Sequence, residues 1–300
     1  AIFPGYESTY EQHIVSDPRK SIFWKPFNRK PVGMNDADWN MIVSAGETAI
    51  KENAVMGFKK IKTFFFFFYL PKTSTTAGVL HMPQGLAYYQ ERVHHYTTTN
   101  MTYEEVYQVG LKEVERIEKE MQLVLKEVGF TGSLQDFIKQ LRVDPRFLPQ
   151  TADQLMKEAS YIAKQADGKL PLLFGKLPRQ PYGVEPVPAD IAPVYTAGRY
   201  SGAPIKSKRA GHYWVNTYNL NSRTLYTLEA LTLHEAVPGH HLQISLTQEL
   251  ENLPNFRRNL YVNAFGEGWG LYCEYLGYEM GFYKDPYSKF GQLTYDMWRA

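Results

Sequence analysis

Several features are scarce in this 300-residue sequence, and each absence excludes something. Cys273 is the only cysteine, so no intrachain disulfide can form. Lys and Arg number 33 against 31 Asp and Glu, and without a basic stripe nucleic acid is not an expected partner. The most apolar run, Thr63 to Leu70, is much shorter than the ~20 residues of a membrane-spanning helix. We therefore expect no transmembrane segment, and we predict that this run is a buried strand or helix segment.

The composition is that of a globular protein, with 44% hydrophobic and 21% charged residues. Helical patterns dominate, so the predicted fold class is mainly α with a minor β component. We expect one mostly helical catalytic domain over residues 1–300. Within it we distinguish a helical part (1–170), a proline-rich wrap (171–210) and a metal-site part (211–300). Both ends look cut, which suggests a piece of a longer protein.

Several helix starts are visible as capping residues. Asn35 or Asp36 is a plausible N-cap for a helix that runs to Lys62. Thr102-Tyr103-Glu104-Glu105 forms a capping box, and apolar residues then recur at helical spacing up to Gly129. Ser133 and Thr151 are predicted to start two further helices.

The second half of the chain begins with a stretch that cannot be a regular helix. Residues 171–204 contain seven prolines, which predicts either a long ordered wrap or a linker, and we favour the wrap. Residues 211–217 read as a short strand. A helix is then expected from Asn221 into the segment that begins His234-Glu235, and another from about Arg257 to Tyr278.

The segment His234-Glu235-Ala236-Val237-Pro238-Gly239-His240-His241 indicates a zinc site. A catalytic zinc ion needs three protein ligands and one open position. In the helical pattern His-Glu-x-x-His, two imidazoles lie one turn apart and the Glu serves as general base. The sequence has the first His and the Glu, but Pro238 stands where the second His belongs.

The second ligand must therefore come from a distorted helix. On an ideal helix His240 would point about 240° away from His234, and His241 would lie about 10.5 Å further along the axis. Pro238 and Gly239 favour a bulge, and a two-residue bulge would bring His240 to the metal. We favour His240 as the ligand and keep His241 as the alternative.

A carboxylate from another element should complete the site. Glu267 lies 27 residues after His240, which leaves room for a turn and an antiparallel return. Gly266, Gly268 and Gly270 would let its helix approach closely. Glu274 lies seven residues further along the same face and could either orient a ligating His or form a plain salt bridge.

These residues carry a resemblance to a known family. The chain from Gly211 to Ala300 resembles the bacterial domain of unknown function 885, and weaker similarity extends upstream. The shared motifs are His212 to Thr217, Leu231 to Gln243, Glu267 to Tyr272, Asp285-Pro286-Tyr287 and Gly291-Gln292-Leu293. Members resemble zinc metallopeptidases of the thermolysin-like superfamily.

The resemblance implies a zincin-like helical domain. Zn²⁺ would be bound by His234, His240 and Glu267, with Glu235 as the general base. Family members are usually longer, secreted or lipid-anchored bacterial proteins. We therefore expect a periplasmic, secreted or lipid-anchored location, although one cysteine also suits the cytoplasm.

The function expected is zinc-dependent hydrolysis of a peptide. Hydrolysis of a non-peptide amide or ester, and a non-catalytic metal-stabilised binding role, remain the alternatives. Tyr213, Asn216 and Tyr272 are candidates for substrate binding, and the strand around Tyr213 could pair with an extended peptide. Arg257 and Arg258 are candidates for binding an oxyanion or a carboxylate.

Overall fold

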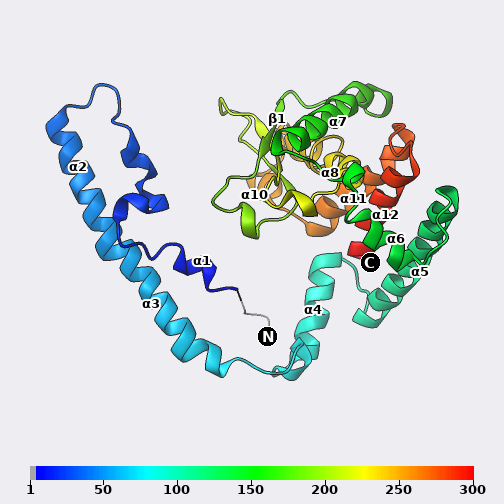
Figure 1. Cartoon of the computed structure of the whole chain (residues 1–300), viewed down its shortest axis with the longest axis horizontal. Helices are drawn as coiled ribbons and strands as arrows, with labels where there is room; N and C mark the ends of the chain where they lie inside the picture. Colours follow the sequence, from blue (N-terminus) through cyan, green and yellow to red (C-terminus); the bar gives the residue numbers. More distant parts are fainter. Residues whose placement is uncertain (1–4) are drawn as a thin grey trace. The chain divides into compact units, whose positions relative to one another are not determined.

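The computed structural model describes residues 5–300, which are mainly helical with one small sheet (Figure 1). This confirms the mainly α class with a minor β component, and the zincin-like fold stays a prediction. Contacts separate the chain into two compact units, Ala1–Gly85 and Leu86–Ala300. That boundary does not coincide with the divisions at residues 170 and 210 that the sequence suggested. The single catalytic domain stays a prediction, and each unit is described by itself.

The first unit is built from three helices and several short turns: α1 (Ser8–Glu11), α2 (Asp36–Ala49) and α3 (Met56–Phe64). A π-helical segment, Ile50–Val55, joins α2 to α3 without a break in the helical path. The Asn35 side chain accepts the N–H of Asp38, so Asn35 is the cap of α2. Trp24 packs with the π-helical segment to form a small core.

The phenylalanine run is helical but is not buried, so that part of its prediction was wrong. It spans the end of α3 and a second π-helical segment, Phe65–Tyr69. Phe65 packs against Tyr6 at a ring-centroid distance of 5.1 Å, whereas Phe67 is 66% exposed. Successive residues of a helix point about 100° apart, so a single packing face cannot cover five consecutive rings. Among the described helices, none combines the length and apolar character that crossing a membrane requires.

The second unit contains the remaining helices. These are α4 (Gly85–Thr97), α5 (Tyr103–Glu127), α6 (Leu134–Leu141), α7 (Ala152–Leu173), α8 (Leu228–Glu235), α9 (His240–Gln248), α10 (Asn255–Asn259), α11 (Asn263–Glu279) and α12 (Pro286–Arg299). Thr102 and Glu105 form the predicted capping box of α5. Ser133 and Thr151 cap α6 and α7 as expected.

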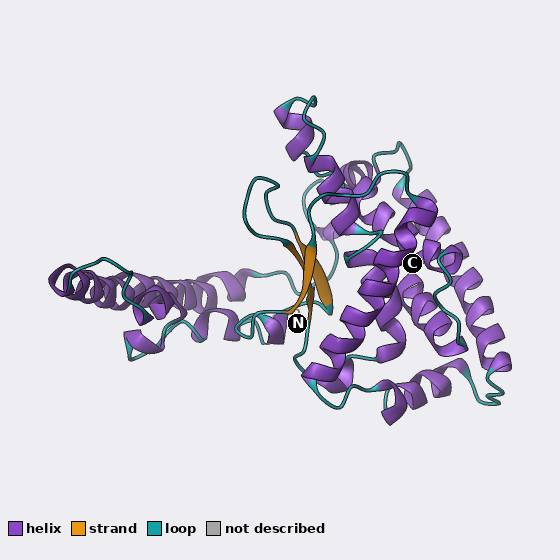
Figure 2. Cartoon of the chain, turned by 90° about the horizontal axis from the view of Figure 1, so that it is seen from above, coloured by secondary structure: helices purple, strands orange, loops and turns teal. Residues whose placement is uncertain are grey.

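A three-stranded mixed sheet lies in the same unit and is drawn in orange in Figure 2. Its strands are β1 (Tyr182–Pro186), β2 (Gly198–Ser201) and β3 (Gly211–Val215). The proline-rich stretch therefore supplies two strands, and α7 continues through Pro171 to Leu173. β3 is central, parallel to β1 and antiparallel to β2. Both edges of β3 are occupied, so it cannot pair with a substrate as we had suggested.

Two hydrophobic clusters hold this unit together. One joins α7, β3 and α8 around Leu155, Tyr213 and Leu233. The other joins α5, α6 and α12 around Ile117, Phe137 and other apolar side chains. α8 also packs against α11 and α12, two consecutive helices near the end of the chain, so these three helices meet beside the His-Glu segment (Figure 1).

Candidate metal centre

The His-Glu segment is a break between two helices. α8 ends at Glu235 and α9 begins at His240, with a cis peptide bond between Val237 and Pro238. Gly239 lies so close to the backbone of His234 that a Cβ atom would overlap its carbonyl group, so only glycine fits. The break places the ring of His240 beside that of His234, with centroids 4.7 Å apart.

Three side chains from three helices converge on one point. One ligand atom each of His234, His240 and Glu267 lies within 4.8 Å of the other two. Oε2 of Glu267 is 3.6 Å from Nε2 of His234 and 3.8 Å from Nε2 of His240. The structure thus brings together the two histidines and the carboxylate that the sequence singled out.

The donor set fits a divalent metal ion. Two imidazoles and one carboxylate form a known catalytic zinc ligand set that leaves one position open. Bonds of about 2.1 Å in tetrahedral geometry separate ligand atoms by about 3.4 Å. The two N···O distances, 3.6 and 3.8 Å, are close to that separation. A small inward movement would let these residues hold the ion.

Each histidine is oriented by a partner on its other nitrogen. Nδ1 of His234 is 2.7 Å from Oε1 of Glu274, and Nδ1 of His240 is 3.3 Å from Oε1 of Gln243. A carboxylate only accepts hydrogen bonds, so Nδ1 of His234 carries the proton that it donates. This leaves Nε2 of His234 as the ligating atom, facing Glu267.

Both carboxylate oxygens of Glu274 accept hydrogen bonds. It is fully buried on α11, and Arg299 of α12 donates to its Oε1 at 2.5 Å and to its Oε2 at 3.1 Å. Gly270, one turn before Glu274 on α11, makes room for the imidazole of His234. A Cβ atom at Gly270 would lie only 2.5 Å from Cε1 of that ring.

The charges around the group favour a cation. Burial lowers the pKa of His234, but hydrogen bonds to Glu267 and Glu274 outweigh burial and raise it to about 9. Hydrogen bonds with His234 and His240 hold the pKa of Glu267 well below its ordinary value. Tyr261 adds a hydrogen bond of 2.9 Å to Oε1 of Glu267. The group therefore binds a positive charge when no metal is present, as a metal ligand set should.

The group opens into a cleft of about 2130 Å³ in the second unit. His234, His240 and Glu267 line it, together with Glu235. Oε2 of Glu235 accepts the backbone N–H of Tyr200 at 2.7 Å, which ties this carboxylate to β2. In the described part of the chain, Oε1 of Glu235 has no hydrogen-bond partner and stays available to accept a proton.

His241, the alternative ligand, points away from the group. It is 2% exposed, and its Nδ1 lies 2.9 Å from the hydroxyl of Tyr200 and 3.3 Å from that of Ser245. Burial lowers the pKa of His241 to about 4, so the ring is neutral. The structure gives it a place in the core between α9 and β2.

The three predicted substrate-binding residues do not line the cleft. Tyr213 is fully buried with its hydroxyl 3.3 Å from that of Thr232. Asn216 is also fully buried and donates to the carbonyls of Ala192, Tyr195 and Thr196. Tyr272 is half exposed but lies outside the cleft. Asn216 has an indirect role, because the loop that it anchors contributes Tyr195 and Thr196 to the cleft wall.

Sequence reasoning missed several residues that surround the group. Gln243 could have been found, since it lies three residues after His240 on the same helix. Tyr261 could have been suspected from its position just before the helix that carries Glu267. Tyr200 and Arg299 gave no local signal, because they reach the site from β2 and the end of α12.

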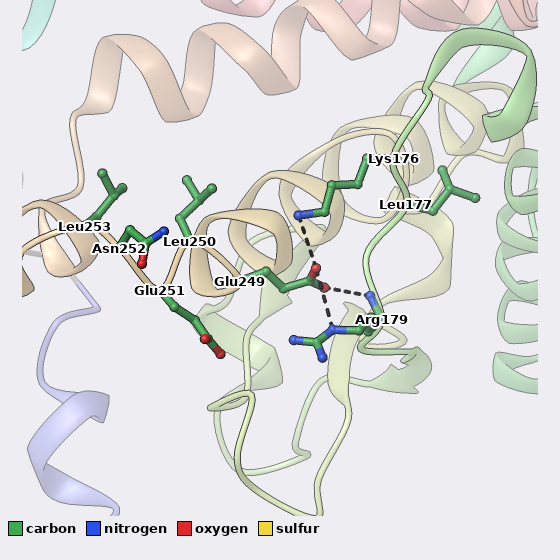
Figure 3. Close-up of a pocket in the computed structure, with 8 residues that line it drawn as sticks. All are labelled: Lys176, Leu177, Arg179, Glu249, Leu250, Glu251, Asn252 and Leu253. Atoms are coloured by element: carbon green, nitrogen blue, oxygen red, sulfur yellow. Dashed lines mark hydrogen bonds and ion pairs between the residues drawn. The ribbon is translucent and has the colours of Figure 1, made fainter.

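A smaller pocket lies at the C-terminal end of α9 (Figure 3). The nearly buried carboxylate of Glu249 accepts the backbone N–H of Arg179 at 2.7 Å. It also forms ion pairs with Nζ of Lys176 at 3.5 Å and Nε of Arg179 at 3.7 Å. These contacts fasten the segment after α7 to α9 and give the pocket a structural explanation.

The fold of this chain resembles that of a solved structure. A solved structure from Colwellia psychrerythraea, described as a "putative lipoprotein", superposes with a TM-score of 0.91 at 23% sequence identity. The match covers 99% of this chain but 52% of the other, so the chain spans about half the length of that relative. Among curated proteins, no match is found. The family described as "Bacterial protein of unknown function (DUF885)" matches residues 5–300, and the chain belongs to this family.

Proposed function

We propose that this protein is a zinc-dependent hydrolase, with peptide bonds as its substrate, and that its catalytic region is zincin-like. The observation that carries the proposal is the convergence of His234, His240 and Glu267 beside Glu235 in one large cleft. A structural zinc site is usually closed by four protein ligands, whereas this group has three and faces open space.

The roles of the residues follow from their positions. A bound zinc ion would supply Lewis-acid activation of water and of the substrate carbonyl. Glu235 would take the proton from the attacking water and transfer it to the leaving amine as the peptide bond breaks. The products are a carboxylic acid and an amine, so atoms and protons balance without a further reactant. Glu274 and Gln243 would keep the imidazoles oriented during the cycle.

The most direct test measures zinc binding and peptide cleavage separately. Elemental analysis of the purified protein should give about one zinc per chain, because the group offers one set of three ligands. Glu235→Gln should keep the zinc and lose peptide cleavage by at least about 100-fold, the usual contribution of a general base. His234→Ala should lose both zinc and activity.

A protein that holds no metal, or that cleaves peptides equally well after Glu235→Gln, would overturn the proposal. Zinc that is retained while esters or non-peptide amides are cleaved in preference to peptides would correct the substrate. If no member of a broad panel of peptides, amides and esters is cleaved by the zinc-loaded protein, the metal is structural and the protein is a binding module.

The cellular location of the protein is also part of the proposal. The lipoprotein description of the Colwellia structure supports a place in the bacterial cell envelope, as a periplasmic, secreted or lipid-anchored protein. Fractionation of the native host, with detection by antibody, would place the protein. Recovery from the cytoplasm alone would contradict this location.

A further inference from the structure

The walls of the cleft carry more positive than negative charge. Arg199, Lys206, Arg257 and Arg258 line it, and none of them has a carboxylate partner among residues 5–300. The acidic lining residues are Glu235 and Glu267, and each accepts a hydrogen bond from the protein on one carboxylate oxygen. Since the whole chain has nearly equal numbers of acidic and basic residues, this excess is a local property of the cleft.

Among these four cations, Arg199 is the one adjacent in sequence to a residue that binds the proposed general base. It directly precedes Tyr200, whose N–H binds Glu235. Tyr200 points into the core toward His241, so Arg199, its neighbour on the strand, points to the other face of β2. There it is paired in register with Trp214, which also lines the cleft.

Arg199 and the carboxylate ligand Glu267 line the same cleft. A negative group bound to Arg199 would therefore share that cleft with the metal group.

Arg257 and Arg258 extend the positive surface from a second element, α10. Arg257 is exposed, and Arg258 is half-buried with a hydrogen bond of 3.4 Å to the carbonyl of Gln248. The guanidinium group pairs with carboxylates through two parallel hydrogen bonds, which makes it the usual residue for carboxylate recognition.

From these positions we infer that the cleft selects substrates bearing a carboxylate next to the hydrolysed bond, with Arg199 as its specificity residue. The inference rests on the proposed hydrolase function and names the substrate class of the same site. Arg257 and Arg258 add a field that draws the anionic substrate into the cleft. The carboxylate can come from a free peptide C-terminus or from an acidic side chain.

Matched peptides distinguish the two sources. One pair differs only in a free or amidated C-terminus, and a second pair has Glu or Gln beside the cleaved bond. The protein should favour one carboxylate-bearing member in kcat/KM by about 10–100-fold, the range for a hydrogen-bonded charge pair. The preferred pair identifies the source. Equal kcat/KM within both pairs would overturn the inference while leaving the hydrolase proposal standing.

Arg199→Gln provides the residue-level test. It should raise KM for the preferred carboxylate peptide by about 10–100-fold, so that this peptide loses most of its advantage over the neutral partner, while the zinc content stays at the wild-type value. Arg199→Lys should restore part of the preference, because the charge is kept and the bidentate geometry is lost. Arg209→Gln, an exposed cation outside the cleft, is the control and should change neither value.

A binding measurement keeps this inference separate from the function proposal. Zinc-loaded Glu235→Gln protein should bind the preferred carboxylate peptide more tightly than its neutral partner in calorimetry, and added salt should reduce the difference. Equal binding of both peptides would contradict the inference even if hydrolysis had never been detected.

Discussion

Glu274 and His234 form a hydrogen bond of 2.7 Å between two helices that are distant in sequence, and Glu274 is completely buried. A buried carboxylate needs compensation for the water that it loses, and Arg299 provides it through two hydrogen bonds. The three residues form a chain from the end of α12 to the metal group. The orientation of one proposed ligand thus depends on α11, which carries a second proposed ligand, and on α12, which carries none.

Glu274→Gln should weaken zinc binding by about 10–100-fold, the usual effect of removing a partner that orients a metal ligand. The amide can still accept a hydrogen bond, but it no longer balances the charge of Arg299. Zinc titration against a competing chelator measures the change. Glu279→Gln, an exposed change on the same helix, should leave the affinity at the wild-type value. Equal affinities for all three proteins would show that the contact does not orient His234.

Replacing His240 or His241 by alanine should have different effects on zinc binding and on stability. His240→Ala should abolish stoichiometric zinc, because it removes one of three ligands. His241→Ala should keep the zinc but lower the free energy of unfolding by about 1–3 kcal/mol, through loss of its buried hydrogen bonds. Elemental analysis and urea denaturation provide the two measurements. Loss of zinc in the His241 variant alone would exchange the roles of the two residues.

Gly270 and Gly268 of α11 offer a matched pair of substitutions by alanine. Gly270→Ala should displace the imidazole of His234, weaken zinc binding and cost about 1–3 kcal/mol of stability, as overpacked sites do. Gly268→Ala meets no atom within 4 Å and should stabilise the helix by about 0.4–1 kcal/mol. Thermal unfolding and chelator competition on both variants test this. A Gly270 variant that binds zinc normally would mean that the helices can separate at no cost.

Asn216→Ala should loosen the loop that contributes Tyr195 and Thr196 to the cleft. The change removes the side-chain donor of the Tyr195 and Thr196 carbonyls and one of the two donors of the Ala192 carbonyl. Each carbonyl left unsatisfied costs about 1–3 kcal/mol when buried. We expect lower stability and a raised KM with zinc content unchanged. Asn221→Ala, an exposed change on the following turn, serves as control. An unchanged KM in a destabilised Asn216 variant would show that the loop does not contact substrate.

The sequence by itself determined the helical class, the helix caps and the identity of the candidate ligands. Capping boxes and periodic apolar residues are local patterns, so Thr102 and Glu105 predicted the start of α5 correctly. The pair His234-Glu235 is equally local, and it indicated zinc chemistry before any geometry was known. The Pro238-Gly239 pair also predicted that the helix is interrupted there.

Only the tertiary structure decided which histidine meets Glu267 and which residues surround the group. The backbone path through Gly239 turns His240 toward α11 and His241 toward β2, a choice set by packing between elements. Arg299, Tyr200 and Arg199 reach the site from far along the chain, and no local pattern marks them. Burial likewise follows from packing, which is why the phenylalanine run is exposed although its composition favoured a buried segment.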